Sequence, residues 1–159
     1  MYKNLIFDMD DTLMLCGVYY MKVRNEFKTF QSERTGVPAE IVDKMLSDFD
    51  LQCTKLPNAF NRERYPRSFA AVSAALDIAQ GHPIDVAAGR ISFDIGDSVF
   101  DAEYALFPGV VHMLTEYLSA GKKLFLCTKG DVSIQWTKIK PKPQRSFIFS
   151  LELQVPGSV

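Results

Sequence analysis

The 159-residue sequence has only three cysteines, Cys16, Cys53 and Cys127, and they are widely scattered. An odd number without paired spacing excludes a disulfide framework and a zinc site, and favours reduced thiols in a cytosol. The length is also too small for two full domains. It is sufficient for one domain with a real core, or for a small domain that carries an insertion.

Net charge and long apolar runs are lacking too. Eighteen Lys and Arg against nineteen Asp and Glu leave a formal charge of −1, so no broad electrostatic attraction to nucleic acid or to an anionic membrane is expected. No stretch approaches the roughly 20 apolar residues that cross a bilayer. The apolar run near Met1 ends in acids too early for a secretory signal. These absences predict a cytoplasmic protein with neither a nucleic-acid nor a membrane partner.

Two short apolar runs predict strands. Tyr2 to Phe7 has the composition of a central strand covered on both faces, and Lys122 to Cys127 follows a helical pattern over Val110 to Ala120. Strands joined through helices and followed by polar loops indicate a parallel sheet, with the ligand beyond the carboxyl ends of the strands. The alternation over Ser146 to Val155 predicts one more, half-exposed strand.

The region between these runs is mostly helical. Apolar residues recur at helical spacing, and Gly or Pro marks the helix ends. The pattern predicts four helices, over residues 18–35, from Pro38 to about Phe49, over 67–80 and over 84–104. A basic loop over 51–66 separates the second helix from the third. A short helical turn is expected again over Ile134 to Lys140.

Residues Ile6 to Leu13, IFDMDDTL, place three carboxylates at the end of the first strand. Asp8 and Asp10 are two residues apart, so in a regular strand their side chains leave on one face and repel each other unless a cation joins them. An all-oxygen site suits Mg²⁺. One carboxylate can then attack a phosphoryl group while the other transfers the proton.

Other interpretations of these residues are open. Asp and Thr after a strand also form ordinary polar turns, and Thr128, after the second strand, can be a simple helix N-cap. Asp11 is expected to be structural or solvated. A calcium loop is excluded because Leu13 and Tyr19 occupy the positions that need Gly and Glu.

The segments FDMDDTL and LFLCTKGD resemble the first two motifs of the haloacid dehalogenase (HAD) superfamily, over Met1 to about Lys140. The resemblance implies that Asp8 is the nucleophile and a metal ligand. It implies that Asp10 is the general acid/base, whose main-chain carbonyl also binds the metal. Thr12 would support that loop, while the Thr128 hydroxyl and the backbone N–H groups of Lys129 and Gly130 would hold the phosphoryl oxygens.

The implied fold class is α/β: an incomplete Rossmann-like parallel sheet core of residues 1–13 and 108–159, with an inserted α-helical cap of residues 14–107. The implied function is Mg²⁺-dependent hydrolysis of a small phosphorylated metabolite through an aspartyl-phosphate. Asp10 favours a phosphatase, because dehalogenating members carry Tyr there and use no magnesium. Arg62, Arg64 and Arg67 are expected to form a solvated basic loop, with contact to an anionic substrate as the alternative.

Two elements of the superfamily are not found in the sequence: a Lys after the next strand and helix, and a closing acidic pair. Lys138, Lys140 and Lys142 follow Thr128 too soon. We therefore expect an altered or truncated C-terminus, self-association through an uncovered sheet edge, and a strongly reduced activity, since each lost electrostatic contact costs on the order of 10² to 10³ in rate. The alternative is a non-catalytic binding or interaction protein on the same scaffold.

Overall fold

The computed structural model describes residues 2–57, 59–139 and 152–153, in two compact units. The core unit comprises Met1–Val18 and Glu103–Val159, and the helical unit comprises Tyr19–Ala102. The sequence placed the insertion at 14–107. The segments that lead out of and back into the core unit bond to each other, Leu15 N–H to the Ala105 carbonyl at 2.8 Å and Phe107 N–H to the Leu13 carbonyl at 3.0 Å. Because of this pairing, both segments belong to the core unit.

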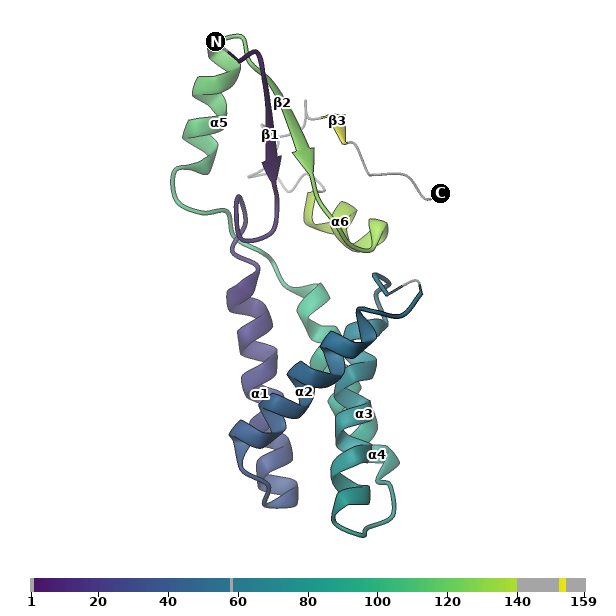
Figure 1. Ribbon diagram of the computed structural model, residues 1–159. Coiled ribbons are helices and arrows are strands. Elements are labelled where there is room, and N and C mark those ends of the chain that lie inside the picture. The colour runs from purple at the N-terminus through teal and green to yellow at the C-terminus, as the bar shows by residue number, and fades with distance from the viewer. Residues whose placement is uncertain (1, 58, 140–151, 154–159) are drawn as a thin grey trace. The chain divides into compact units, whose positions relative to one another are not determined.

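A parallel sheet organises the core unit. Its strands are β1 (Asn4–Asp8), β2 (Lys123–Cys127) and β3 (Glu152–Leu153), in the order β1-β2-β3 with both pairings parallel. Helix α5 (Val110–Ser119) precedes β2, and α6 (Val132–Ile139) follows it, as Figure 1 shows. This arrangement confirms the predicted α/β class with an incomplete Rossmann-like sheet.

The position of β1 differs from the prediction. The apolar run was expected at the centre of a covered sheet, but β2 is central, with Leu124 and Leu126 buried, while β1 lies at the edge of the described sheet and Ile6 is 72% exposed. Apolar composition does not distinguish a central strand from an edge strand, because that depends on which strands pair beside it. Of the predicted strand over 146–155, only Glu152–Leu153 lies within the described residues.

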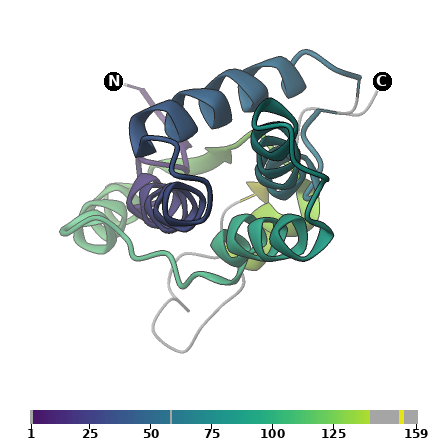
Figure 2. The same ribbon diagram turned by 90° about the horizontal axis from the view of Figure 1, so that it is seen from below.

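The helical unit is built from α1 (Gly17–Thr35, which begins in the core unit), α2 (Ala39–Cys53), α3 (Arg64–Ala79), α4 (Val86–Asp97) and the 3-10 helix η1 (Ser98–Asp101). The four predicted helices are confirmed, although their bounds differ by several residues. Figure 2 shows α1 nearly end-on with α2 lying crosswise to it. No helix in the described part of the chain is both long and apolar enough to span a membrane.

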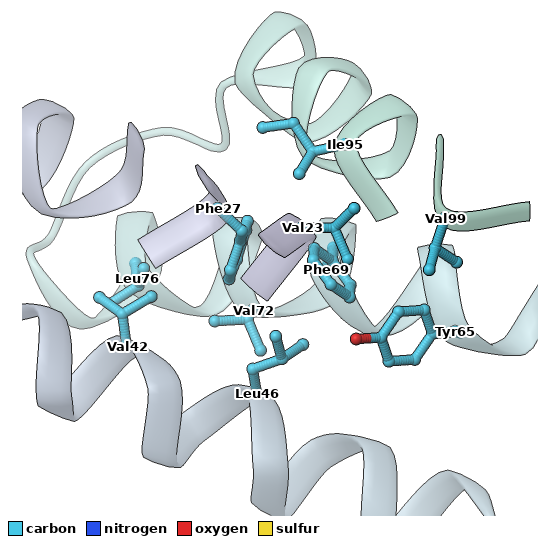
Figure 3. Close-up of a cluster of buried hydrophobic side chains, with 10 residues drawn as sticks. All are labelled: Val23, Phe27, Val42, Leu46, Tyr65, Phe69, Val72, Leu76, Ile95 and Val99. Atoms are coloured by element: carbon cyan, nitrogen blue, oxygen red, sulfur yellow. The ribbon is translucent and has the colours of Figure 1, made fainter. Parts of the chain in front are cut away.

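One apolar cluster joins the elements of the helical unit (Figure 3). Its centre is Phe27 of α1, which is fully buried and lies with its ring centroid 4.7 Å from that of Phe69 on α3. The cluster comprises Val23, Phe27, Val42, Leu46, Tyr65, Phe69, Val72, Leu76, Ile95 and Val99. Burial of these side chains is the main stabilisation of the unit.

A buried ion pair lies in the same unit. Arg34 Nη1 of α1 donates to Asp77 Oδ1 of α3 at 2.6 Å, and the Asp85 backbone N–H donates to Asp77 Oδ2 at 2.9 Å. Burial alone would raise the pKa of Asp77, but these hydrogen bonds, the Arg34 charge and the nearby His82 hold it below its ordinary value. The pair therefore links α1 and α3 and fixes the start of α4 beside Asp85.

Candidate active site

The carboxyl ends of β1 and β2 bring the two predicted motifs together. Asp8, the last residue of β1, is in register with Cys127, the last residue of β2, so Thr128 follows directly beside the Asp8 strand end. Asp8 is exposed, and among the described residues its carboxylate accepts one hydrogen bond, from the Thr12 hydroxyl at 3.3 Å. The predicted nucleophile is thus accessible, and Thr12 supports it from within the same loop.

The loop after β1 is a compact turn. The N–H groups of Leu13 and Met14 both donate to the Met9 carbonyl, at 3.0 and 3.1 Å, and Met9 is buried. Asp11 has a positive φ of 55°, and its Oδ1 accepts the backbone N–H groups of Cys16 at 3.0 Å and Gly17 at 2.7 Å. Asp11 therefore caps the start of α1, which agrees with a structural role.

The Asp10 carboxylate is surrounded by donors. Oδ1 receives Lys138 Nζ at 2.9 Å and Cys16 Sγ at 3.1 Å, whereas Oδ2 receives Lys138 Nζ at 3.1 Å and Gln135 Nε2 at 3.2 Å. Only 3% of the Lys138 side chain is exposed, and its ammonium lies 4.9 Å from the centre of the Tyr104 ring. Asp10 thus carries a full set of partners, including a buried cation.

Lys138 does not follow a further strand and helix, as the sequence indicated, but it still reaches the site from the helix directly after β2. Helix α6 begins almost directly after β2 and returns its last turn to Asp10. Sequence reasoning missed Gln135 and Lys138, although their spacing of three residues places them on one helical face. Lys140 and Lys142 lie outside the described residues.

The electrostatics of this cluster favour one ionised group and one neutral group. Burial raises the pKa of Asp10, but hydrogen bonds from Cys16, Lys138 and Gln135, together with the Lys138 charge, outweigh it and leave the pKa below its ordinary value. Burial and the hydrogen bond to Asp10 raise the pKa of Cys16 to about 12. The carboxylate is therefore ionised near neutral pH, and the thiol stays protonated and donates to it.

The loop after β2 is ordered by the same groups. Asp131 caps α6, because its Oδ1 accepts the backbone N–H groups of Ser133 at 2.9 Å and Ile134 at 3.3 Å. The interpretation of Thr128 as the helix N-cap is therefore wrong. Thr128 is buried, and no residue in the described part of the chain hydrogen-bonds to its hydroxyl.

Gln135 ties this loop to Asp10. Its Nε2 donates both to the Lys129 carbonyl at 2.9 Å and to Asp10. Gly130 has a φ of +147°, and a Cβ there would meet Gln135 Nε2 at 2.8 Å. The loop that was predicted to hold phosphoryl oxygens is thus fixed relative to the acid, and it requires a glycine at this position.

The oxygen donors of the β1 end fit a magnesium ion. Asp8 offers an exposed carboxylate, and no backbone N–H in the described part of the chain bonds to the Asp10 carbonyl. Within residues 2–57, 59–139 and 152–153, no group of three or more His, Cys, Asp or Glu side chains gathers as a metal cluster. Mg²⁺ keeps several waters and needs only one or two carboxylates plus substrate phosphate, so this small donor set is compatible with it.

The segment expected to be a solvated basic loop is partly helical, and its three arginines are paired with carboxylates, with the side chains of Arg67 and Arg62 71% and 41% exposed. Arg62 donates to Asp97 at 3.0 and 2.8 Å, Arg64 pairs with Asp50, and Arg67 pairs with Glu63. Arg64 and Arg67 lie in α3, which begins three residues earlier than predicted, since Pro66 is tolerated within the first helical turn. Each guanidinium has a carboxylate partner within its own unit.

Comparisons with known proteins place this geometry in a fold family. No protein-family profile and no curated protein matches the chain. A haloacid dehalogenase-like family hydrolase from Xanthomonas campestris matches in structure at 18% identity and a TM-score of 0.70, over 96% of this chain and 61% of that one. The HAD-hydrolase YfnB from Bacillus subtilis, bound to magnesium, matches at 15% identity and a TM-score of 0.55, over 96% and 63%.

A dehalogenase crystallised with an intermediate complex matches as well, at 14% identity and a TM-score of 0.53, over 95% of this chain and 60% of that one. The chain thus spans about three fifths of the length of the solved structures that it matches. These likenesses show that the chain has the HAD-like hydrolase fold, as the two motifs predicted.

Proposed function

We propose that this chain with the HAD-like hydrolase fold is a magnesium-dependent phosphohydrolase of a small phosphorylated metabolite. The observation that carries the proposal is the meeting of Asp8 and Thr128 at the carboxyl ends of paired strands, with the Asp8 carboxylate exposed. An exposed carboxylate, a hydroxyl without a hydrogen-bond partner in the described part of the chain and a glycine loop suit attack on a phosphoryl group.

Each residue of the site has a separate role in phosphoryl transfer. An Asp8 oxygen attacks phosphorus and forms an aspartyl-phosphate while the P–O bond to the leaving alcohol breaks and the alcohol oxygen takes a proton from Asp10. The Thr128 hydroxyl with the N–H groups of Lys129 and Gly130 binds the phosphoryl oxygens. The Asp8 carboxylate and the Asp10 main-chain carbonyl would hold a magnesium ion, which would supply positive charge that offsets the charge of the phosphate. A water then hydrolyses the intermediate and regenerates Asp8.

Asp10 is the proton donor and acceptor of this proposal. To donate a proton it must first take one up, which requires it to give up one of the hydrogen bonds that it accepts, and the longest is the one from Gln135 at 3.2 Å. A carboxylate beside the nucleophile serves the leaving group of a phosphate ester, whereas dehalogenation needs no such acid. The site therefore favours a phosphatase over a dehalogenase.

A second candidate is a non-catalytic binding protein on the same scaffold. It is supported by the ion pair that occupies Asp10 and by the lack of a further acid beside Asp8 in the described ranges 2–57, 59–139 and 152–153. Weak metal binding would lower the rate. The expected activity is strongly reduced.

The test is release of p-nitrophenol from p-nitrophenyl phosphate by purified, folded protein, with and without Mg²⁺. The proposal expects a magnesium-dependent rate that Asp8→Asn abolishes and that Asp48→Asn, a matched change at an exposed helical position, leaves intact. No release above the Asp8→Asn background would favour the non-catalytic candidate. Halide release from 2-chloropropionate without metal would instead indicate a dehalogenase.

The cytoplasmic location, the metabolite partner and self-association remain predictions. Self-association is supported by the position of β1 at the edge of the described sheet and by the exposure of Ile6 on it.

A further inference from the structure

The two acids of the β1 end have opposite surroundings. Asp8 is exposed with the Thr12 hydroxyl as its partner in the described part of the chain, whereas Asp10 is held by a lysine, an amide and a thiol. Repulsion between them does not require a metal for its relief, because Lys138 already provides a positive charge to one member. The same lysine also affects whether the Asp10 carboxylate can bind a metal or transfer a proton.

The hydrogen bonds of Asp10 leave no acceptor position for a metal. A carboxylate has about four lone-pair sites, two on each oxygen. Oδ1 accepts from Lys138 and Cys16, and Oδ2 accepts from Lys138 and Gln135. A divalent ion at this carboxylate would have to displace a donor and would lie next to an ammonium, which like-charge repulsion disfavours.

Lys138 is itself fixed on several sides. Its ammonium lies against the Tyr104 ring as well as the Asp10 carboxylate, and its side chain is almost fully buried. It occupies the last turn of α6, where a cation is favoured, and Asp131 caps the first turn of the same helix. The helix thus presents a rigid cation to Asp10.

From these contacts we propose that Lys138 is a positioning residue that keeps the Asp10 carboxylate out of the coordination sphere of the metal. The metal is then left to Asp8 and to the Asp10 main-chain carbonyl, and the Asp10 side chain stays available for proton transfer. This inference rests on the proposed function. It assigns to Lys138 of α6 a positioning role, and this residue lies outside the segments FDMDDTL and LFLCTKGD.

The test compares metal affinity with turnover in Lys138→Met. Without the ammonium, the Asp10 carboxylate can reach the metal, so Mg²⁺ measured by isothermal titration calorimetry without phosphate should bind on the order of tenfold more tightly. Hydrolysis of p-nitrophenyl phosphate should fall by on the order of 10². A purely structural lysine would weaken both, so the opposite directions distinguish a positioning role.

Two further variants keep the result unambiguous. Lys123→Met removes the same charge from the exposed start of β2 and should change neither quantity by more than about twofold, since exposed charges are screened. If Lys138→Met does not fold, Lys138→Met/Asp10→Asn should fold, because it removes the uncompensated buried carboxylate. If the double variant also fails to fold, the proposed pairing of Lys138 with Asp10 is overturned.

The outcomes separate this inference from the proposed function. Equal or weaker Mg²⁺ binding by folded Lys138→Met, in a chain whose unmodified form binds the ion, overturns the positioning role and leaves the phosphohydrolase proposal standing. A folded, unmodified chain that binds no Mg²⁺ refutes the proposed function and, with it, this role. In that case the pairing of Lys138 with Asp10 is tested by stability alone. It is supported if Asp10→Asn restores the stability of Lys138→Met, and contradicted if it does not.

Discussion

Replacement of Arg34 by Met tests whether the buried ion pair organises the helical unit. The change removes the guanidinium that bonds Asp77 at 2.6 Å and leaves a carboxylate whose side chain is 2% exposed. Removal of one partner of a buried pair commonly costs about 3 to 5 kcal/mol. We expect the lower end, about 3 kcal/mol, because Asp77 keeps the Asp85 N–H.

The reverse change should cost less. Asp77→Asn leaves Arg34, which is 21% exposed and can regain water, and the amide oxygen can still accept the Asp85 N–H. We therefore expect a smaller loss of stability than in Arg34→Met. An exposed control, Lys44→Met, breaks the pair with Asp48 and should cost less than about 1 kcal/mol.

The pH dependence follows from the direction of the Asp77 pKa. In the unmodified chain this pKa is lowered, so its stabilisation is complete above the unfolded value of about 3.9 and is lost as the pH falls through the folded value. In Arg34→Met, burial is opposed mainly by the Asp85 N–H and His82, and the pKa should rise. The penalty should therefore be largest near pH 7 and shrink on acidification below about pH 4.

Urea unfolding followed by circular dichroism at 222 nm measures the helical unit. With a urea dependence of about 1.5 kcal/mol/M, a 3 kcal/mol loss shifts the midpoint by about 2 M. Trp136, the single tryptophan, lies on α6 of the core unit, so its fluorescence follows that unit separately. A shift no larger than that of Lys44→Met, or a penalty that grows at low pH, would refute the reasoning.

Four other variants have defined outcomes. Phe27→Ala empties the centre of the helical cluster and should cost about 3 to 5 kcal/mol in urea unfolding. Asp11→Ala removes the cap of α1 and should cost about 1 to 2 kcal/mol in the same assay, whereas Asn should retain most of the cap. Gly130→Ala should displace Gln135 and lower phosphatase turnover about tenfold or more, with Gly89→Ala, where a Cβ meets nothing, as the matched control. Ile6→Lys should reduce self-association in light scattering, and an unchanged mass would contradict the role of the β1 edge.

Several features of this protein could be predicted from its sequence because they depend on neighbouring residues. The periodicity of apolar side chains predicted the helices and the β2 strand, and an acid-rich strand end followed by a second strand ending in Thr128 predicted the α/β fold. Asp11 was expected to be structural or solvated, and its carboxylate accepts the N–H groups at the start of α1. Such patterns express local backbone geometry, in which side chains three or four residues apart share a helix face and those two apart share a strand face.

The tertiary structure alone decided which residues meet. It placed β1 at the edge of the described sheet, gave each of the three arginines a carboxylate partner, and brought Lys138 to Asp10 across 128 positions of sequence. The sequence-based interpretation missed this lysine because the length of a connection does not reveal where a helix points. A buried cation comes to lie beside a carboxylate because of how the helices and strands pack, and packing is a property of the folded chain as a whole.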